Sequence, residues 1–193
     1  MSSLTALKKF SIPFIKLAFF LCIIYWIYMV CLCEMVVADD SIGYEDLGKQ
    51  LVENGWIHYL KIGPSREPLY PLFISWSMHL AKAFSISYQT ILMFMQIGIL
   101  FISQLLLVKI FKKLNIHSAL IALGIFYFGF SISVLSSALR LYSEILAYPL
   151  MLTFVLFTTE FLENIINNTP SQKCKWLAFG LSLNLLLLTF HLP

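Results

Sequence analysis

The chain has 193 residues, of which 60% are hydrophobic and 12% carry a charge, against about 45–50% and about 25% in an ordinary soluble domain. This composition excludes a soluble globular domain, because no polar face recurs at the helical period through the long apolar stretches. The net charge of +3 does not indicate nucleic-acid binding, since the basic residues form small groups beside the apolar segments and not one basic patch.

The apolar segments predict an all-α, polytopic transmembrane helical bundle that forms a single membrane domain. A helix that crosses hydrocarbon needs about 20 mainly apolar residues. Five segments meet or approach that length, at 12–36, 88–110, 116–135, 145–161 and 176–192. The first is too long for the apolar part of a cleaved signal and is expected to remain as an anchor. Its Cys22, Cys31 and Cys33 are expected to pack, not to form disulfides or a zinc site.

Residues 37–87 are predicted to form one large outer loop that contains two interfacial helices. In 43–54, Tyr44, Leu47 and Leu51 follow helical spacing, and charged residues occupy the other side. This helix is expected to end at Gly55. Pro68 is expected to open the second helix, 68–84, because a missing amide hydrogen costs nothing in a first turn.

The orientation follows from the distribution of lysines. If 68–84 lies on the membrane surface, all the lysine groups flanking the spans fall on one side, which is then the cytoplasmic side. The amino terminus is therefore expected in the cytoplasm, and Glu144 lies outside with the acidic residues of the large loop. The inner lysines are Lys8, Lys9, Lys16, Lys109, Lys112, Lys113, Lys173 and Lys175.

Charged residues at the outer mouth of the spans are candidates for function, because charges close to hydrocarbon are expensive to keep. For the acids after the first span, helix capping is the alternative. For Arg140 and Glu144 of the second outer loop, the alternative is an ion pair that the two residues form with each other at a helix end. His58 is a candidate metal ligand or proton carrier, and interfacial packing is its alternative. The other candidates are Asp39, Asp40, Arg66, Glu67, Arg140 and Glu144.

Three motifs in order resemble the amino-terminal part of the GT-C membrane glycosyltransferases, which include protein mannosyltransferases and the bacterial aminoarabinose and mannosyl transferases. The motifs are Asp40-Ser41-Ile42-Gly43-Tyr44, Pro68-Leu69-Tyr70-Pro71-Leu72 and Ser143-Glu144, and the resemblance covers residues 12 to about 163. It implies a GT-C-like fold and transfer of a sugar from a polyprenyl-phosphate donor to an acceptor on the outer face. The family usually has Pro-Pro-Leu where this chain has Glu67-Pro68-Leu69.

The resemblance implies roles for individual residues. Asp40 matches the catalytic aspartate of the first loop, because an aromatic residue stands four positions later, and it would deprotonate the acceptor hydroxyl. Glu144, with Asp39, would hold the acceptor or a divalent cation, for which His58 is a further candidate ligand. The donor phosphate would be held by basic side chains, since negative charge develops there. These are Arg66, Arg140 and Lys61.

Members of the family are longer, and later helices complete their donor groove. The chain is therefore expected to be an amino-terminal portion, and activity is expected of the complete protein. Two alternatives stay open: a non-enzymatic membrane protein, such as a transporter piece or an assembly subunit, and an inactive truncated relic of the enzyme. The expected location is a bacterial inner membrane, with the endoplasmic reticulum as the alternative. The lipid bilayer and a polyprenyl-phosphate-linked sugar are the expected partners, and nucleic acid is not.

Overall fold

A computed structural model describes residues 2–37, 40–62, 66–166 and 176–184, with the side chains of all of these except 2–13 and 40. These residues are almost entirely helical and include no β-strand. A further helical stretch occupies 176–184. The named elements are α1 (Ser2–Leu32), α2 (Asp40–Ile62), α3 (Leu69–Phe84), α4 (Tyr88–Lys113), α5 (Ser118–Phe130), α6 (Ile132–Leu139), the 3₁₀ helix η1 (Ser143–Leu146) and α7 (Ala147–Ile166).

Within the described residues, three helical segments are long and apolar enough to cross a bilayer: Phe14–Leu32, Tyr88–Lys113 and Ser143–Ile166. Helices α5 and α6 would together make a fourth, but they are bent by 47° at the break between them. The chain thus has the helices of an integral, multi-pass membrane protein. The expected straight span at 116–135 is interrupted at Ser131, and residues 185–192 of the expected last span lie outside the described residues.

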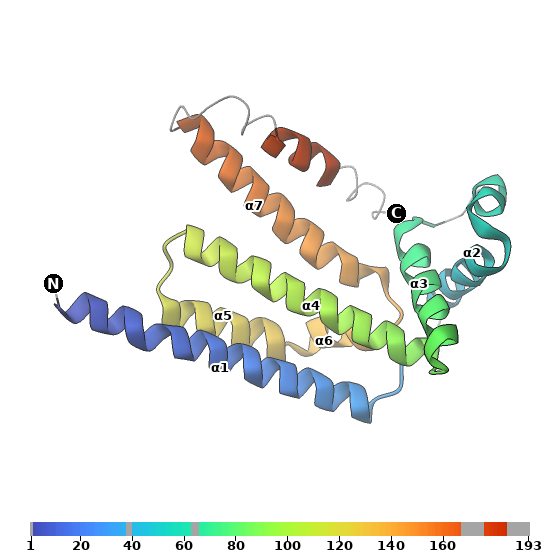
Figure 1. The fold of residues 1–193 in the computed structure, drawn as a ribbon, viewed down its shortest axis with the longest axis horizontal. Coiled ribbons are helices and arrows are strands. Elements are labelled where there is room, and N and C mark those ends of the chain that lie inside the picture. Colours follow the sequence, from blue (N-terminus) through green and yellow to red (C-terminus); the bar gives the residue numbers. More distant parts are fainter. Residues whose placement is uncertain (1, 38–39, 63–65, 167–175, 185–193) are drawn as a thin grey trace.

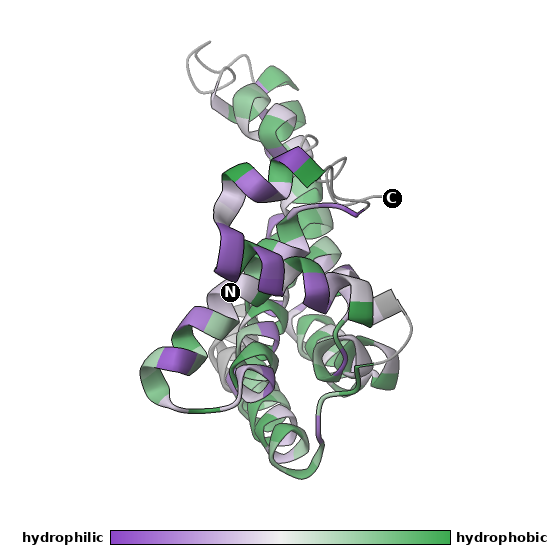
Figure 2. Cartoon of the chain, turned by 90° about the vertical axis from the view of Figure 1, so that its right-hand side faces the viewer, coloured by the Kyte–Doolittle hydropathy of each residue, from purple (hydrophilic) through white to green (hydrophobic). Residues whose placement is uncertain are grey.

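The long helices run side by side, and α2 and α3 lie together at one end of them (Figure 1). Helix α4 is central, because it contacts α1, α3, α5, α6 and α7. Helix α1 packs along α5, where Tyr25 stacks on Phe130 with ring centroids 4.7 Å apart. Figure 2 looks onto the end that carries α2 and α3, and it shows hydrophilic residues on the nearest helices with mostly hydrophobic helices behind them.

The break at Ser131 is stabilised by side chains from neighbouring helices. The last four carbonyl groups of a helix have no partner within it, and in α5 these include the carbonyl of Gly129. That oxygen accepts a 2.8 Å hydrogen bond from Nε1 of Trp26 in α1. At the end of α6, Nε2 of Gln96 donates to the carbonyl oxygens of Ser137 and Arg140, at 3.3 and 2.8 Å. The Gly129 carbonyl at the bend and these two carbonyls at the end of α6 are therefore satisfied inside an apolar bundle.

Helices α2 and α3 pack on each other. Helix α2 is kinked at Gly55, whose φ of 73° is a left-handed conformation that suits glycine. The expected helix end at Gly55 is thus a kink, and the helix resumes to Ile62. The α2 face that carries Tyr44 and Leu51 is buried, and Gly48 lets Ile74 of α3 approach closely. The apolar side expected to face lipid is therefore largely covered by protein. Whether both helices lie on an outer membrane surface stays a prediction.

The opposite end of the bundle carries ion pairs between α4 and α7. Nζ of Lys113 lies 2.6 Å from Oε2 of Glu163, and Nζ of Lys109 lies 3.8 Å from Oε1 of Glu160. Because α4 runs away from α2 and α3, these lysines are separated from the loop helices by the length of the bundle (Figure 1).

Candidate functional site at the α2–α3 end of the bundle

Backbone pairing joins the segment after α1 to the segment after α6. Val36 and Arg140 form an isolated parallel β-bridge. The amide of Val36 donates to the carbonyl of Leu139, and the amide of Leu141 donates to the carbonyl of Val36, both at 3.3 Å. A chain extends at most about 3.6 Å per residue. Asp40 and Glu144 each stand four residues from a bridge partner, so the backbone of each lies within about 14 Å of it.

Tyr44 lies at the point where α2, the segment before α3 and the second loop meet. Its side chain is buried, with 7% of its surface exposed. Its hydroxyl donates a hydrogen bond to Oε1 of Glu67 and lies 3.2 Å from Oγ of Ser143, which is also buried. Three segments that are far apart in the sequence are therefore tied to one hydroxyl group.

Arg66 covers the face of the Tyr44 ring, with Cζ 4.8 Å from the ring centroid, a typical cation–π distance. Gly43 makes room for this contact, since a Cβ there would lie 3.0 Å from Nε of Arg66. Burial and the hydrogen bond to Glu67 raise the pKa of Tyr44, while Ser143 and Arg66 act in the opposite direction. The net effect keeps the phenol protonated, so that Tyr44 remains a hydrogen-bond donor to the carboxylate.

Tyr70 extends this cluster into α3. Its ring packs edge-on against Tyr44, with centroids 5.4 Å apart, and its side chain is completely buried. Its hydroxyl makes no hydrogen bond of good geometry with the described residues, although the Tyr142 backbone is near enough to lower its pKa. Burial and then the negative charge of Glu144 outweigh that effect and raise the pKa. The carboxylate of Glu144, which is exposed, therefore acts electrostatically on the same cluster.

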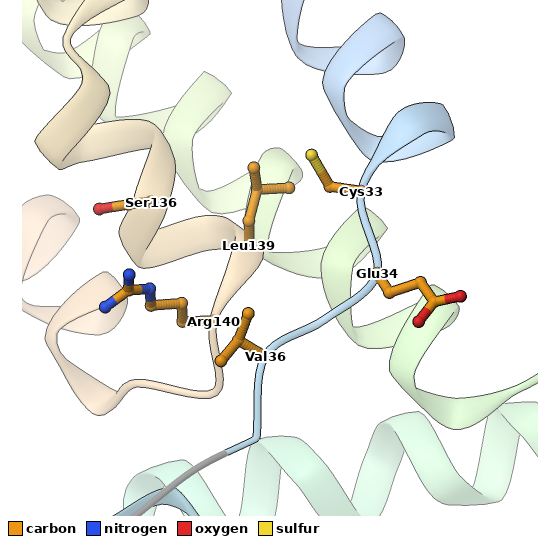
Figure 3. Close-up of a pocket in the computed structure, with 6 residues that line it drawn as sticks. All are labelled: Cys33, Glu34, Val36, Ser136, Leu139 and Arg140. Carbon is orange, nitrogen blue, oxygen red and sulfur yellow. The ribbon is translucent and has the colours of Figure 1, made fainter.

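Arg140 lines an open pocket beside the backbone bridge. The pocket has a volume of about 360 Å³ and is lined by Cys33, Glu34, Val36, Ser136, Leu139 and Arg140. In Figure 3 the guanidinium of Arg140 and the carboxylate of Glu34 point in opposite directions. The guanidinium lies 6.0 Å from the centroid of the Tyr142 ring. Arg140 is thus exposed and turned away from Glu34.

An apolar groove of about 310 Å³ lies between α3, α4 and the start of α7. Two of its lining residues are close in the sequence to charged residues. Leu69 comes two positions after Glu67 and three after Arg66, and Leu146 comes two positions after Glu144. The groove can accept an aliphatic chain next to a charged head group. Its lining residues are Leu69, Leu72, Phe73, Trp76, Ile99, Leu146, Pro149 and Leu150.

The remaining candidates are placed as follows. Asp40 is the first residue of α2, and its side chain and all of Asp39 lie outside the described residues. Lys61 and His58 are exposed on the part of α2 beyond the kink. Among the residues whose side chains are described, no three histidine, cysteine, aspartate or glutamate side chains converge as a metal site. A cation held by Glu144, Asp39 or His58 stays a prediction.

The sequence did not single out Tyr44 or Ser143 as site residues, and it left Glu67 without a role. Tyr44 and Glu67 are 23 positions apart, and Tyr44 and Ser143 are 99 apart. A local pattern cannot predict such contacts. The available signals were the tyrosine one helical turn after Asp40 and the serine that precedes Glu144.

The chain matches no family model, no curated protein and no solved structure.

Proposed function

We propose that the complete protein is a membrane glycosyltransferase. It moves a sugar from a polyprenyl-phosphate donor to an acceptor hydroxyl at the membrane face that carries α2 and α3. The proposal extends the GT-C resemblance of the three motifs, and it makes the bilayer the reservoir of the donor.

The observation that carries the proposal is the backbone pairing of Val36 with Arg140. It holds the segment that leads to Asp40 beside the segment that leads to Glu144, at one end of the helical bundle. The apolar groove is lined by residues of α3, which lies at the same end. An isoprenoid chain in this groove would leave its phosphate among arginine and carboxylate groups, which is the arrangement that transfer from a lipid-linked sugar needs.

The reaction is a displacement at the anomeric carbon of the donor sugar. The carboxylate of Asp40 takes the proton of the acceptor hydroxyl, and the acceptor oxygen forms a bond to the anomeric carbon. The bond from that carbon to the phosphate oxygen breaks, and the polyprenyl phosphate leaves with the electron pair. Arg66 and Arg140 stabilise the negative charge on the phosphate, because guanidinium groups bind phosphate oxygens in pairs. Glu144 accepts a hydrogen bond from the acceptor.

The bend at Ser131 favours the alternative of a transporter, because transport sites are often built from interrupted helices whose backbone groups bind the substrate. Here the Gly129 carbonyl at the bend accepts from Trp26, and Ile125 O accepts from Gln104. Both oxygens already accept hydrogen bonds from protein side chains. The bend therefore supports a transporter less strongly than the charged residues at the α2–α3 end support an enzyme.

The test replaces Asp40 by asparagine in the complete protein. The variant is reconstituted in proteoliposomes with undecaprenyl phosphate that carries tritiated mannose or aminoarabinose, and loss of label from the lipid is measured with and without added membrane extract as acceptor. Removal of a general base is expected to slow transfer by about 10²-fold or more. The matched control is Asp46→Asn, because Asp46 is an exposed residue of the same helix, and it should leave the rate unchanged.

Two results would count against the proposal. Absence of transfer by the wild-type protein with both donors and the extract would remove the proposed function. Transfer at the wild-type rate by Asp40→Asn would leave the function standing and remove the role of Asp40.

A further inference from the structure

The Tyr44 hydroxyl is an unusual connection, because it lies between residues that approach it from two different loops. Glu67 comes from the segment before α3, and Ser143 from the start of η1. Arg66, the neighbour of Glu67, lies over the face of the same ring. Arg66 and Glu67 are thus both turned towards Tyr44, one to its ring and the other to its hydroxyl.

A glutamate side chain has three rotatable bonds and does not hold a fixed position unless something restrains it. Here the restraint is a charge-assisted hydrogen bond from a buried phenol, which is stronger than a bond between neutral groups. The phenol cannot move away easily, because its side chain is buried and its ring contacts both the Arg66 guanidinium and the Tyr70 ring. The carboxylate of Glu67 is therefore held in one place beside Arg66.

The sugar of a polyprenyl-phosphate donor is bonded directly to the phosphate. If Arg66 binds that phosphate, a carboxylate on the adjacent residue lies at the level of the sugar. An ionised carboxylate only accepts hydrogen bonds, and sugar hydroxyls are donors that it can take.

We propose that Glu67 binds a hydroxyl group of the donor sugar, and that Tyr44, whose hydroxyl also contacts Ser143, is a positioning residue that fixes the Glu67 carboxylate. This inference rests on the proposed function, and it assigns a role to the residue at which the chain departs from the family's Pro-Pro-Leu pattern.

The experiment compares Tyr44→Phe, Glu67→Gln and the double variant in the complete protein, with the two undecaprenyl-phosphate sugars as probes. Each single variant is expected to lower kcat/KM for the donor by about tenfold or more, with a rise in KM, because a hydrogen bond to a charged group is lost. The double variant should match Glu67→Gln, since Tyr44 acts through Glu67. Ser143→Ala, which removes one hydroxyl without changing the aromatic packing, should give a smaller loss in the same direction.

Tyr59→Phe is the matched control. Tyr59 is a buried tyrosine of the same helix whose hydroxyl makes no hydrogen bond with the described residues, so its loss should change neither kinetic constant. Thermal unfolding of each variant distinguishes a positioning role from a purely structural one. A purely structural role would lower the melting temperature, and the folded fraction would keep the KM of the wild type.

The outcomes separate the two claims. A wild-type protein that is inactive with both donors overturns the proposed function and this inference with it. An active wild type with a Tyr44→Phe variant of unchanged KM and kcat overturns this inference alone. The inference is also overturned if the loss of kcat/KM in the double variant equals the product of the two single-variant losses, because the two residues would then act independently.

Discussion

At Gly129 the contact between α1 and α5 allows no side chain larger than a hydrogen atom. A Cβ placed there would lie 2.2 Å from Sγ and 2.9 Å from Cβ of Cys22, and 2.9 Å from Nε2 of Gln104. The Cβ of Cys22 is close to the backbone and cannot turn away. The residue type at this position is therefore dictated by the approach of two other helices, and the backbone there needs no left-handed conformation.

Gly129→Ala is expected to destabilise the protein by about 1–3 kcal/mol, because overpacking forces the α1 and α5 backbones apart. Thermal unfolding in detergent checks this. Gly98→Ala is the control, since a Cβ at Gly98 of α4 meets nothing within 4 Å, and alanine favours a helix over glycine by about 1 kcal/mol. Equal melting temperatures for the two variants would show that the close approach at Gly129 does not limit stability.

At the scale of elements, Gln96 of α4 closes the end of α6. It supplies the donor for the carbonyls of Ser137 and Arg140, which the helix itself leaves unpaired. Because Arg140 also belongs to the β-bridge, one side chain of the central helix supports the geometry of the second loop.

Gln96→Met keeps the length of the side chain and removes the donor. We expect a loss of about 2 kcal/mol, because two carbonyl groups lose a partner in a buried environment. Sugar transfer should fall further than stability alone explains, since Arg140 and Glu144 lose support. Ser103→Ala on the same helix is the control, because its hydroxyl donates to the carbonyl of Ile99 within α4 itself. Unfolding in detergent and the transfer assay check both; a Gln96→Met protein as stable and active as Ser103→Ala would contradict the expectation.

The helices themselves were largely predictable, whereas their interruptions were not. Length and apolar composition indicated the segments that the structure shows as α1, α4 and α7, because lipid imposes these requirements on any span. The break at Ser131 carries no proline and no charge. The carbonyl of Gly129 beside it is satisfied by a donor from Trp26, which belongs to another helix. A pattern confined to one segment cannot contain that information.

At the scale of the whole molecule, the charged groups are divided between the two ends. The end with α2 and α3 carries the candidate site, and the other carries the pairs of Lys109 and Lys113 with Glu160 and Glu163. The sequence anticipated that Asp40 and Glu144 share one end, because the lysines were expected on the cytoplasmic side. It could not predict contacts between the loops, such as that of Tyr44 with Ser143, since these join residues far apart in the sequence.

Cysteine labelling tests this division. In a variant with its four cysteines replaced by alanine, single cysteines at Asp46, Glu144 and Lys112 are treated with a membrane-impermeant maleimide in intact cells. All three residues are exposed. Asp46→Cys and Glu144→Cys should be labelled from outside, and Lys112→Cys only after the cells are opened. Labelling of Asp46→Cys and Glu144→Cys from different compartments would refute a shared site.

The bridge between Val36 and Arg140 also constrains how the protein is made. Its partners are separated by α2 to α6, so the pairing cannot form until the ribosome has delivered the end of α6 to the membrane. Until then the strand-like residues after α1 have no main-chain partner there. The charged end of the molecule is consequently assembled late in biogenesis, after the chain up to Arg140 has been made.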